Sequence, residues 1–432
     1  MTSYAPSRTT GAVPDTAASQ RRVLRALVAS QILSGAGLAA GITVGALLAQ
    51  DMLGSTGLAG LPLALSTGGS ALAAVAVGRV SQARGRRPGL TAGYLTGAVG
   101  AAGVITAAAL HSPVLLFAAL FVYGAGTATN LQARYAGADL AAPGHRGRAV
   151  STVLVATTLG GVAGPNLAAP TGVLAESLGL PHLAGPFLLS GAAYLSAAVV
   201  LAGWMRPDPL LLARTVAAAE AGGGTEAGNE AGGGGAATDP AAGAAGRGEG
   251  RGGVFLGALV MVLTQLVMVA IMTMTPVHMH AHGHGTAASG LVISLHIAAM
   301  YLPSPLTGRL VDRIGRIRIA VAAGAVLPAA GVLAAAAPAD SVALLALALA
   351  LLGLGWNFGL VAGTAVITDT VPLATRARTQ GLVDVSVALA GAAGATASGV
   401  VVAATGYPVL ALTAAALSLA LLPAVTVTAH RR

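Results

Sequence analysis

The stretch that decides the fold is GRVSQARGRR (78–87), which returns 230 residues later (308 − 78) as GRLVDRIGRI (308–317). The same offset relates further pairs of residues. They are Asp139 and Asp369, Arg146 and Arg376, Arg148 and Arg378, Gly161 and Gly391, and Gly164 and Gly394. A fixed internal offset is typical of a duplicated architecture. The chain therefore consists of two related halves in tandem.

Both halves are strongly apolar. Hydrophobic residues make up 55% of the chain, charged residues only 9%, and the mean hydropathy is +0.79, whereas a soluble domain carries about 25% charged residues. A membrane-spanning helix needs about 20 apolar residues, and the chain has long apolar runs such as Leu90–Leu110 and Gly399–Val427. Strand-like alternation is absent, so the sequence predicts an all-α integral membrane protein.

We predict twelve transmembrane helices in two six-helix, pseudo-symmetric halves. The spans are 23–50, 57–80, 88–111, 113–138, 149–176, 182–205, 253–280, 285–308, 317–338, 341–369, 379–405 and 407–429. The halves cover 23–205 and 253–429, flanked by a tail over 1–22 and a short end over 430–432. Residues 206–252 are rich in Gly and Ala and cannot bury a core, so we expect a disordered linker there.

Arginine supplies all 23 basic residues, and the formal charge is +9. The Arg residues fall at the N-terminus, in the even-numbered loops, in the linker and at the C-terminus. Positive charge in alternate loops is typical of the cytoplasmic side. We therefore expect both termini in the cytoplasm, in a plasma or inner cell membrane, and no nucleic-acid partner. No cleavable signal peptide is evident.

Several chemistries are excluded by composition. Without Cys there is no thiolate chemistry, and without Lys there is no Walker sequence for ATP. No nucleophile–base arrangement is evident, so we expect neither an enzyme nor a bound cofactor. A duplicated helical membrane protein is most often a transporter. The expected partners are the lipid bilayer, a small-molecule or metal-ion substrate and protons as coupling ion, with a monomer as the functional unit.

The repeat, the twelve spans and the two basic loops together resemble the major facilitator superfamily over residues 20–430. That resemblance implies gating roles for the loop residues. These are Gly78, Arg79, Gly85, Arg86, Gly308, Arg309, Asp312, Arg313, Gly315 and Arg316. The first loop has Gln82 where the family has an Asp that locks neighbouring helices, so the lock of the N-terminal half is in question. A charge network of Arg134, Asp139, Asp369 and Asp384 is expected, with Asp384 about one turn inside its span and able to carry a proton.

Methionine and histidine gather in spans 7 and 8. Met268 and Met272, and likewise His296 and Met300, share a helix face at i, i+4. Counting 14 residues from a turn near residue 282 places Met268 and His296 at similar depth, about 15–20 Å below the outer surface. Thioether and imidazole donors suit Cu(I). The first half has Leu38, Ile42, Ser66 and Ser70 at the matching positions, so the scaffold does not require these donors.

This spacing resembles the copper-importing CcoA-like (CalT) branch of the superfamily, which implies copper as transported substrate with Met268, Met272, His296 and Met300 as ligands. A Met stripe is also common as packing. His278, His280, His282 and His284 form a His-rich tract at the outer mouth, which predicts either a cation-capture site or a solvated turn.

Two alternative functions stay open at this point. Proton-coupled efflux of small organic or drug-like molecules is common in the superfamily, and Gly164-Pro165 resembles a pattern of its antiporters. A non-transporting metal sensor or receptor belongs to another class and would need a signalling domain. The leading interpretation is secondary transport by alternating access, with copper moving inward.

Overall fold

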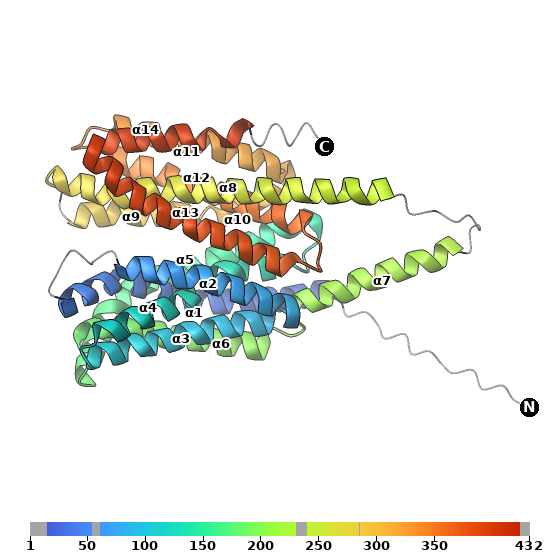
Figure 1. Cartoon of the computed structure of the whole chain (residues 1–432), viewed down its shortest axis with the longest axis horizontal. Helices are drawn as coiled ribbons and strands as arrows, with labels where there is room; N and C mark the ends of the chain where they lie inside the picture. The colour runs from blue at the N-terminus through green and yellow to red at the C-terminus, as the bar shows by residue number, and fades with distance from the viewer. Residues whose placement is uncertain (1–14, 54–60, 230–239, 285, 424–432) are drawn as a thin grey trace, which may run out of the picture.

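The computed structural model describes residues 15–53, 61–229, 240–284 and 286–423, which contain helices and no strand. Two helical bundles lie side by side, α1–α6 in one and α8–α14 in the other, with α7 between them in the chain (Figure 1). The helices of the first half are α1 (Thr16–Leu53), α2 (Leu61–Arg84), α3 (Arg86–Ala109), α4 (Pro113–Ala138), α5 (Arg146–Ser177) and α6 (Gly185–Trp204). Those of the second are α8 (Pro240–Ala281), α9 (Thr286–Tyr301), α10 (Ser304–Ile314), α11 (Arg316–Ala336), α12 (Val342–Thr370), α13 (Arg376–Thr405) and α14 (Tyr407–Ser418).

Eight helical segments of the described chain are long and apolar enough to cross a membrane by length and composition. They include α3, α4, α6, α8, the α9–α10 pair, α11, α12 and α13. Together with α1, α2, α5 and α14 they account for six spans in each half. The predicted all-helical membrane architecture with twelve spans is confirmed. Each half also has its own buried hydrophobic cluster.

Span 8 is not one helix, because it breaks between α9 and α10. The break falls at Pro303, whose ring nitrogen cannot donate the hydrogen bond that a continuous helix needs. Asn357 of α12 fills the gap, since its amide donates to Met300 O and to Ser304 Oγ, each at 2.7 Å. The matching position in the first half is Ala73, and α2 runs through it unbroken.

The linker differs from the expectation of disorder in the part that the structure describes. α7 (Pro209–Asn229) is helical, and α8 already begins at Pro240. Asp208 starts α7 by accepting hydrogen bonds from the N–H groups of Leu210 and Leu211, and the following LLLAR and VAAAEA segments are strong helix formers. Residues 230–239 lie outside the described residues, as do residues 1–14 of the tail and 424–432 at the other end.

The two halves meet closely at the end of the bundle that carries the loops 84–87 and 313–318, which we call the basic end. There α2 packs on α13 and α5 packs on α10. A Cβ on Gly78 would lie 2.9 Å from Ala377 O, and one on Gly308 would lie 2.5 Å from Gly147 O. Only glycine fits such contacts. These two contacts are related by the offset of 230, so the same packing is built twice.

Candidate functional site

Two polar side chains at the same repeat position join the halves at the basic end. Asp312 of α10 accepts hydrogen bonds from the N–H groups of Gly147 (2.8 Å) and Arg148 (3.0 Å) at the start of α5. Gln82 of α2 accepts from Ala377 (2.9 Å) and Arg378 (3.4 Å) at the start of α13. Each acceptor lies at the N-terminus of a helix in the other half, where unpaired N–H groups favour it.

Gln82 therefore preserves the lock that its missing charge had put in question. Its amide group is also a donor, which a carboxylate is not. It donates to the carbonyl oxygens of Leu373 (3.3 Å) and Ala374 (short in this structure) just before α13. The first lock is thus neutral and uses both ends of an amide, whereas the Asp312 lock is charged and adds an ion pair to Arg148 at 3.5 Å.

Two charge clusters repeat the same symmetry. Asp139 pairs with Arg86 of its own half (Nε–Oδ2 2.7 Å) and with Arg376 of the other half (3.7 Å). Asp369 pairs with Arg316 of its own half and with Arg146 of the other half. Every partner is the mate of its counterpart at offset 230. The structure thus joins Arg86, Asp139, Arg316 and Asp369, all singled out from the sequence, into two bridges between the halves.

The remaining loop residues make no contact between the halves that is described above. Gly85 and Gly315 turn the chain between helices with φ of 101° and 97°, a backbone conformation that favours glycine. Arg79, Arg309 and Arg313 are exposed. These side chains add positive charge to the basic end.

One ion pair has no counterpart in the repeat. Arg134 of α4 donates to Asp384 of α13 at 2.7 Å, and both side chains are buried, at 0% and 3% exposure. Tyr135 also donates to the same carboxylate oxygen, at 3.2 Å. The mates of Arg134 and Asp384 are Thr364 and Leu154, so the second half cannot form this pair. Arg134 also donates a hydrogen bond to Thr364, its own mate in the repeat, at 3.0 Å.

Asp384 lies deeper than the sequence indicated. α13 begins at Arg376, three residues before the expected start, so Asp384 lies about 12 Å inside at 1.5 Å per residue. Its second oxygen, Oδ2, is buried and makes no hydrogen bond. The carboxylate thus has one paired and one unpaired oxygen, enclosed beside Arg134.

The methionine and histidine donors lie on α8 and α9, and both of these helices pack along α12. Met268 of α8 and Met300 of α9 are buried and His296 is fully enclosed, while Met272 is half-buried. Although α8 and α9 follow each other in the chain, they touch each other little: α9 packs mainly along α12, and α8 packs along both α12 and α13. His296 Nδ1 is hydrogen-bonded to Leu349 O of α12 at 2.8 Å, which leaves its buried Nε2 without a partner.

The His-rich tract lies at the end opposite to the basic end, which we call the histidine end. His278 stacks on Tyr407, with ring centroids 4.4 Å apart, and His282 lies against His278. His284 bonds Ala339 O at 2.7 Å, and His280 is exposed. Among the residues that the structure describes, no three His, Asp or Glu side chains form a group that could hold a metal ion.

Trp356, a residue that our sequence reasoning missed, stands between α8 and α9. It lies at the middle of α12, its indole Nε1 donates to Gln265 of α8 at 2.8 Å, and its ring packs edge-on against Tyr301 of α9 at 5.6 Å. A signal was available, because membrane tryptophans concentrate at the interfaces and Trp356 interrupts an apolar run far from either end of its span.

Comparison with known proteins places this geometry among transporters. Residues 26–301 and 257–432 match the sequence profile of the Major Facilitator Superfamily. The chain is 56% identical over 405 residues to the uncharacterized MFS-type transporter YdeG of Bacillus subtilis (strain 168), covering 94% of this chain and 91% of the relative. It is 30% identical over 374 residues to the riboflavin transporter RfnT of Brucella anthropi, covering 85% and 86%.

Solved structures show the same fold at low identity. A bacterial homologue of the iron transporter ferroportin in an outward-facing state superposes with a TM-score of 0.72 at 14% identity, covering 94% of this chain and 99% of that one. At that identity the likeness carries the arrangement of helices and nothing about substrate.

The two locks predict unequal effects of their removal. Asp312→Ala should open the basic end more than Gln82→Ala, because hydrogen bonds to a charged group contribute about 1.5–3 kcal/mol and neutral ones about 0.5–1.5 kcal/mol. Asp312→Gln should lie between the parent and Asp312→Ala, since Gln keeps an acceptor for the start of α5, as Gln82 does in the first half, but loses the charge. The measurement is the rate of maleimide labelling of Ser151→Cys, a buried site beside Gly308 in a chain without Cys.

Asp340→Ala is the matched control, because this exposed Asp lies at the histidine end. Its labelling rate should equal that of the parent. Labelling of the Asp312→Gln variant as fast as that of Asp312→Ala would show that the charge of Asp312, and not its pairing with the start of α5, holds the halves together.

Proposed function

Because the chain belongs to the Major Facilitator Superfamily and is a multi-pass membrane transporter rather than an enzyme, we propose that it carries a small planar aromatic solute, of the flavin class, by alternating access. The observation that carries the substrate proposal is Trp356. Its ring lies at mid-span between α8 and α9, fixed by Gln265 and Tyr301. Transporter sites usually lie near the bilayer midplane, and aromatic rings bind one another by offset or edge-on packing.

The neighbouring groups suit the same class of solute. Gln265 and Tyr301 are half-buried, and both carry donors and acceptors for the heteroatoms of a ring system. No charged side chain belongs to this cluster of three. The riboflavin transporter RfnT, as a relative over most of the chain, supports the flavin class independently of this geometry.

We assign the basic end to the cytoplasm by the positive-inside rule. The ion pairs and hydrogen bonds described above between the halves all lie near that end. We therefore interpret the structure as the state closed toward the cytoplasm, in which solute reaches Trp356 from the histidine end. Opening toward the cytoplasm must break both locks, both charge clusters and the Arg134–Asp384 pair.

Proton coupling follows from the Arg134–Asp384 pair in this proposal. Breaking a buried pair strands a charge, which costs about 3–5 kcal/mol, unless Asp384 takes up a proton as Arg134 withdraws. The groups that face Asp384 are Arg134 and Tyr135, with Arg86 next to the Tyr135 ring at 5.9 Å. A proton on Asp384 would neutralise one partner and lower the barrier to opening.

Copper uptake is the second candidate, and the unpaired Nε2 of His296 favours it. An imidazole whose Nδ1–H is bound to a carbonyl presents a fixed lone pair at Nε2, which is the usual form of a metal ligand. Met268 and Met300 would add thioethers, Met272 would assist, and the His-rich tract would collect the ion. The four donors lie on α8 and α9, which touch each other little, so this proposal requires these two helices to approach each other during transport.

The aromatic proposal predicts that the ring of Trp356 is needed for transport. In proteoliposomes loaded with unlabelled riboflavin, the parent should accumulate external labelled riboflavin by counterflow, an exchange that needs no coupling ion. Trp356→Ala should lower the initial rate about two- to tenfold, since loss of an aromatic contact costs about 0.5–1.5 kcal/mol. Trp356→Phe should retain most of the rate.

The exposed Trp204 supplies the control, because Trp204→Phe changes the chain's other tryptophan far from this cluster. Counterflow that is equal in the parent and in Trp356→Ala would remove Trp356 from solute binding, and counterflow that is absent from the parent would reject flavins as the substrate class.

The coupling proposal predicts a specific split of activities in Asp384→Asn. Exchange of solute by counterflow should persist, because Asn keeps the shape and accepts a hydrogen bond from Arg134. Accumulation driven by an imposed pH gradient should fall to the level of empty liposomes, because Asn carries no proton. Gradient-driven accumulation that survives this change would remove Asp384 from the coupling mechanism.

The copper proposal predicts uptake of Cu(I) into proteoliposomes that depends on two donors. His296→Gln and Met268→Leu should each reduce copper accumulation at least tenfold, because each removes a soft or imidazole ligand while keeping the size of the side chain. Met274→Leu is the matched control, since Met274 is half-buried on the same helix outside the four-donor set. Unchanged copper uptake in both variants would reject these donors as the copper site, and no copper uptake by the parent would reject copper as the substrate.

A further inference from the structure

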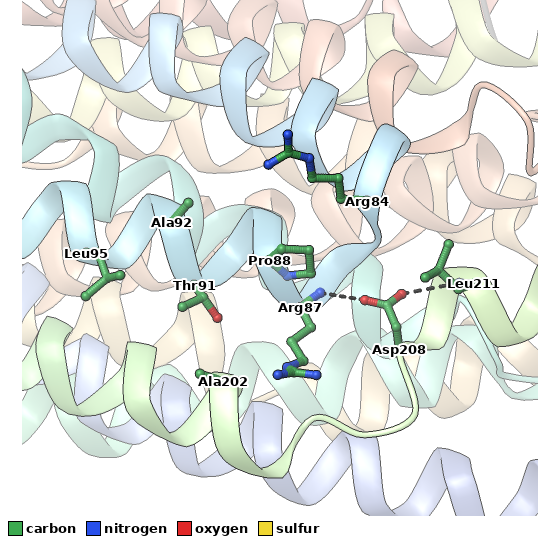
Figure 2. Close-up of a pocket in the computed structure, with 9 residues that line it drawn as sticks. All are labelled: Arg84, Arg87, Pro88, Thr91, Ala92, Leu95, Ala202, Asp208 and Leu211. Carbon is green, nitrogen blue, oxygen red and sulfur yellow. Dashed lines mark hydrogen bonds between the residues drawn. The ribbon is translucent and has the colours of Figure 1, made fainter.

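A cavity of about 530 Å³ opens at the basic end of the first half, outside every element of the transport site (Figure 2). It lies where the start of α3 meets the end of α6 and the start of α7. Arg84 and Arg87 line it on one side. Ala92, Leu95 and Ala202 form an apolar wall that continues along α3 and α6 in the direction of the membrane.

The two arginines are additions to the loop rather than part of its repeated design. At offset 230 their mates are Ile314 and Ile317, whereas the loop residues Gly85 and Arg86 are matched by Gly315 and Arg316. The turn therefore folds without Arg84 and Arg87. Among the residues that the structure describes, the guanidinium groups of Arg84 and Arg87 make no hydrogen bond or ion pair. Both are therefore available to a ligand.

The cavity already contains a carboxylate, and its bonding leaves the arginines free. Asp208 accepts hydrogen bonds from the N–H of Arg87 at 2.7 Å and from the N–H groups of Leu210 and Leu211 (Figure 2). It thus occupies the N-terminus of α3 and pairs with backbone rather than with guanidinium groups. Thr91 adds a hydroxyl whose oxygen is buried and makes no hydrogen bond.

The depth of the cavity matches the polar layer of a membrane. Trp204 ends α6 beside it and is 63% exposed, and exposed tryptophans on membrane proteins mark the level of the lipid headgroups. Leu95, one of the wall residues, is 41% exposed and lies toward the middle of α3. Positive charge at headgroup level above an apolar wall is the arrangement that suits an anionic lipid.

We propose that this cavity binds the phosphate group of an anionic phospholipid of the cytoplasmic leaflet. Arg84 and Arg87 hold the phosphate oxygens, the hydroxyl of Thr91 donates to one of them, and an acyl chain lies along Ala92 and Leu95. Guanidinium groups bind a phosphate with charge-assisted hydrogen bonds. The site is separate from the solute pathway, and it touches α7, which links the two halves.

The test is native mass spectrometry of the detergent-purified full chain with added phosphatidylglycerol or phosphatidylcholine. The parent should retain phosphatidylglycerol at least fivefold more than phosphatidylcholine. Arg84→Gln/Arg87→Gln should abolish that preference. Arg318→Gln is the control, because it removes a positive charge from an exposed arginine of the other basic loop, and it should keep the preference.

A second variant tests the apolar wall and guards against misfolding of the double mutant. Ala92→Phe fills the wall at an exposed position without changing charge, and it should lower retention of phosphatidylglycerol at least threefold. Loss of the preference in Arg318→Gln would show general charge attraction and overturn the site. Retention unaffected by Ala92→Phe but lost on addition of millimolar inorganic phosphate would assign the arginines to free phosphate instead of a lipid.

Discussion

The hydrogen bonds from Asp312 and Gln82 to the first N–H groups of α5 and α13 are the contacts on which the closed arrangement depends. Each places an acceptor of one half at a helix start of the other half. Such caps contribute about 0.5–2 kcal/mol each, so two of them hold the halves firmly but reversibly. They form only because glycines at 78 and 308 allow the backbones to approach, and the same approach brings the Asp139 and Asp369 clusters within reach of their partners.

The repeat accounts for most contacts between the halves at the basic end, and the Arg134–Asp384 pair is the contact that it does not account for. Locks, glycine contacts and charge clusters each occur twice at an offset of 230, so the two halves can separate by breaking matching sets of contacts. The Arg134–Asp384 pair occurs once. Because a buried pair is destabilising when it loses one partner, this pair gives the opening step a dependence on the charge of Asp384 that the symmetric contacts lack.

The sequence predicted the parts of the structure that depend on composition and repetition. Apolar runs and the offset defined twelve spans, and the charged pairs at 139 and 369 were visible as repeated residues. The sequence could not predict the break in span 8, because a proline is tolerated in membrane helices and the break depends on Asn357 of another helix. It also underestimated α7, where a Gly- and Ala-rich composition masked a short run of strong helix formers after Asp208.

The donor set in spans 7 and 8 shows why spacing along the chain does not define a site. Met268 and His296 were expected to face each other because their spans are consecutive, yet α12 packs along both and Trp356 occupies the space between α8 and α9. Which helix lies between two neighbours is decided by packing over long sequence distances, and one sequence does not record it. The side chain best placed at mid-span therefore came from a helix that the spacing argument never considered.

The asymmetry between the halves adds a physical reason for locating solute recognition in the second one. The mates of Gln265, Tyr301 and Trp356 are Gly35, Ala71 and Gly126, three of the smallest residues. In the first half these positions serve close packing: a Cβ on Gly35 would lie 2.6 Å from Thr157 O. Two halves with the same helix arrangement thus differ in the size of the side chains at these matched positions. At these three positions the first half packs closely, whereas the second half carries the large polar and aromatic side chains to which we assign solute binding.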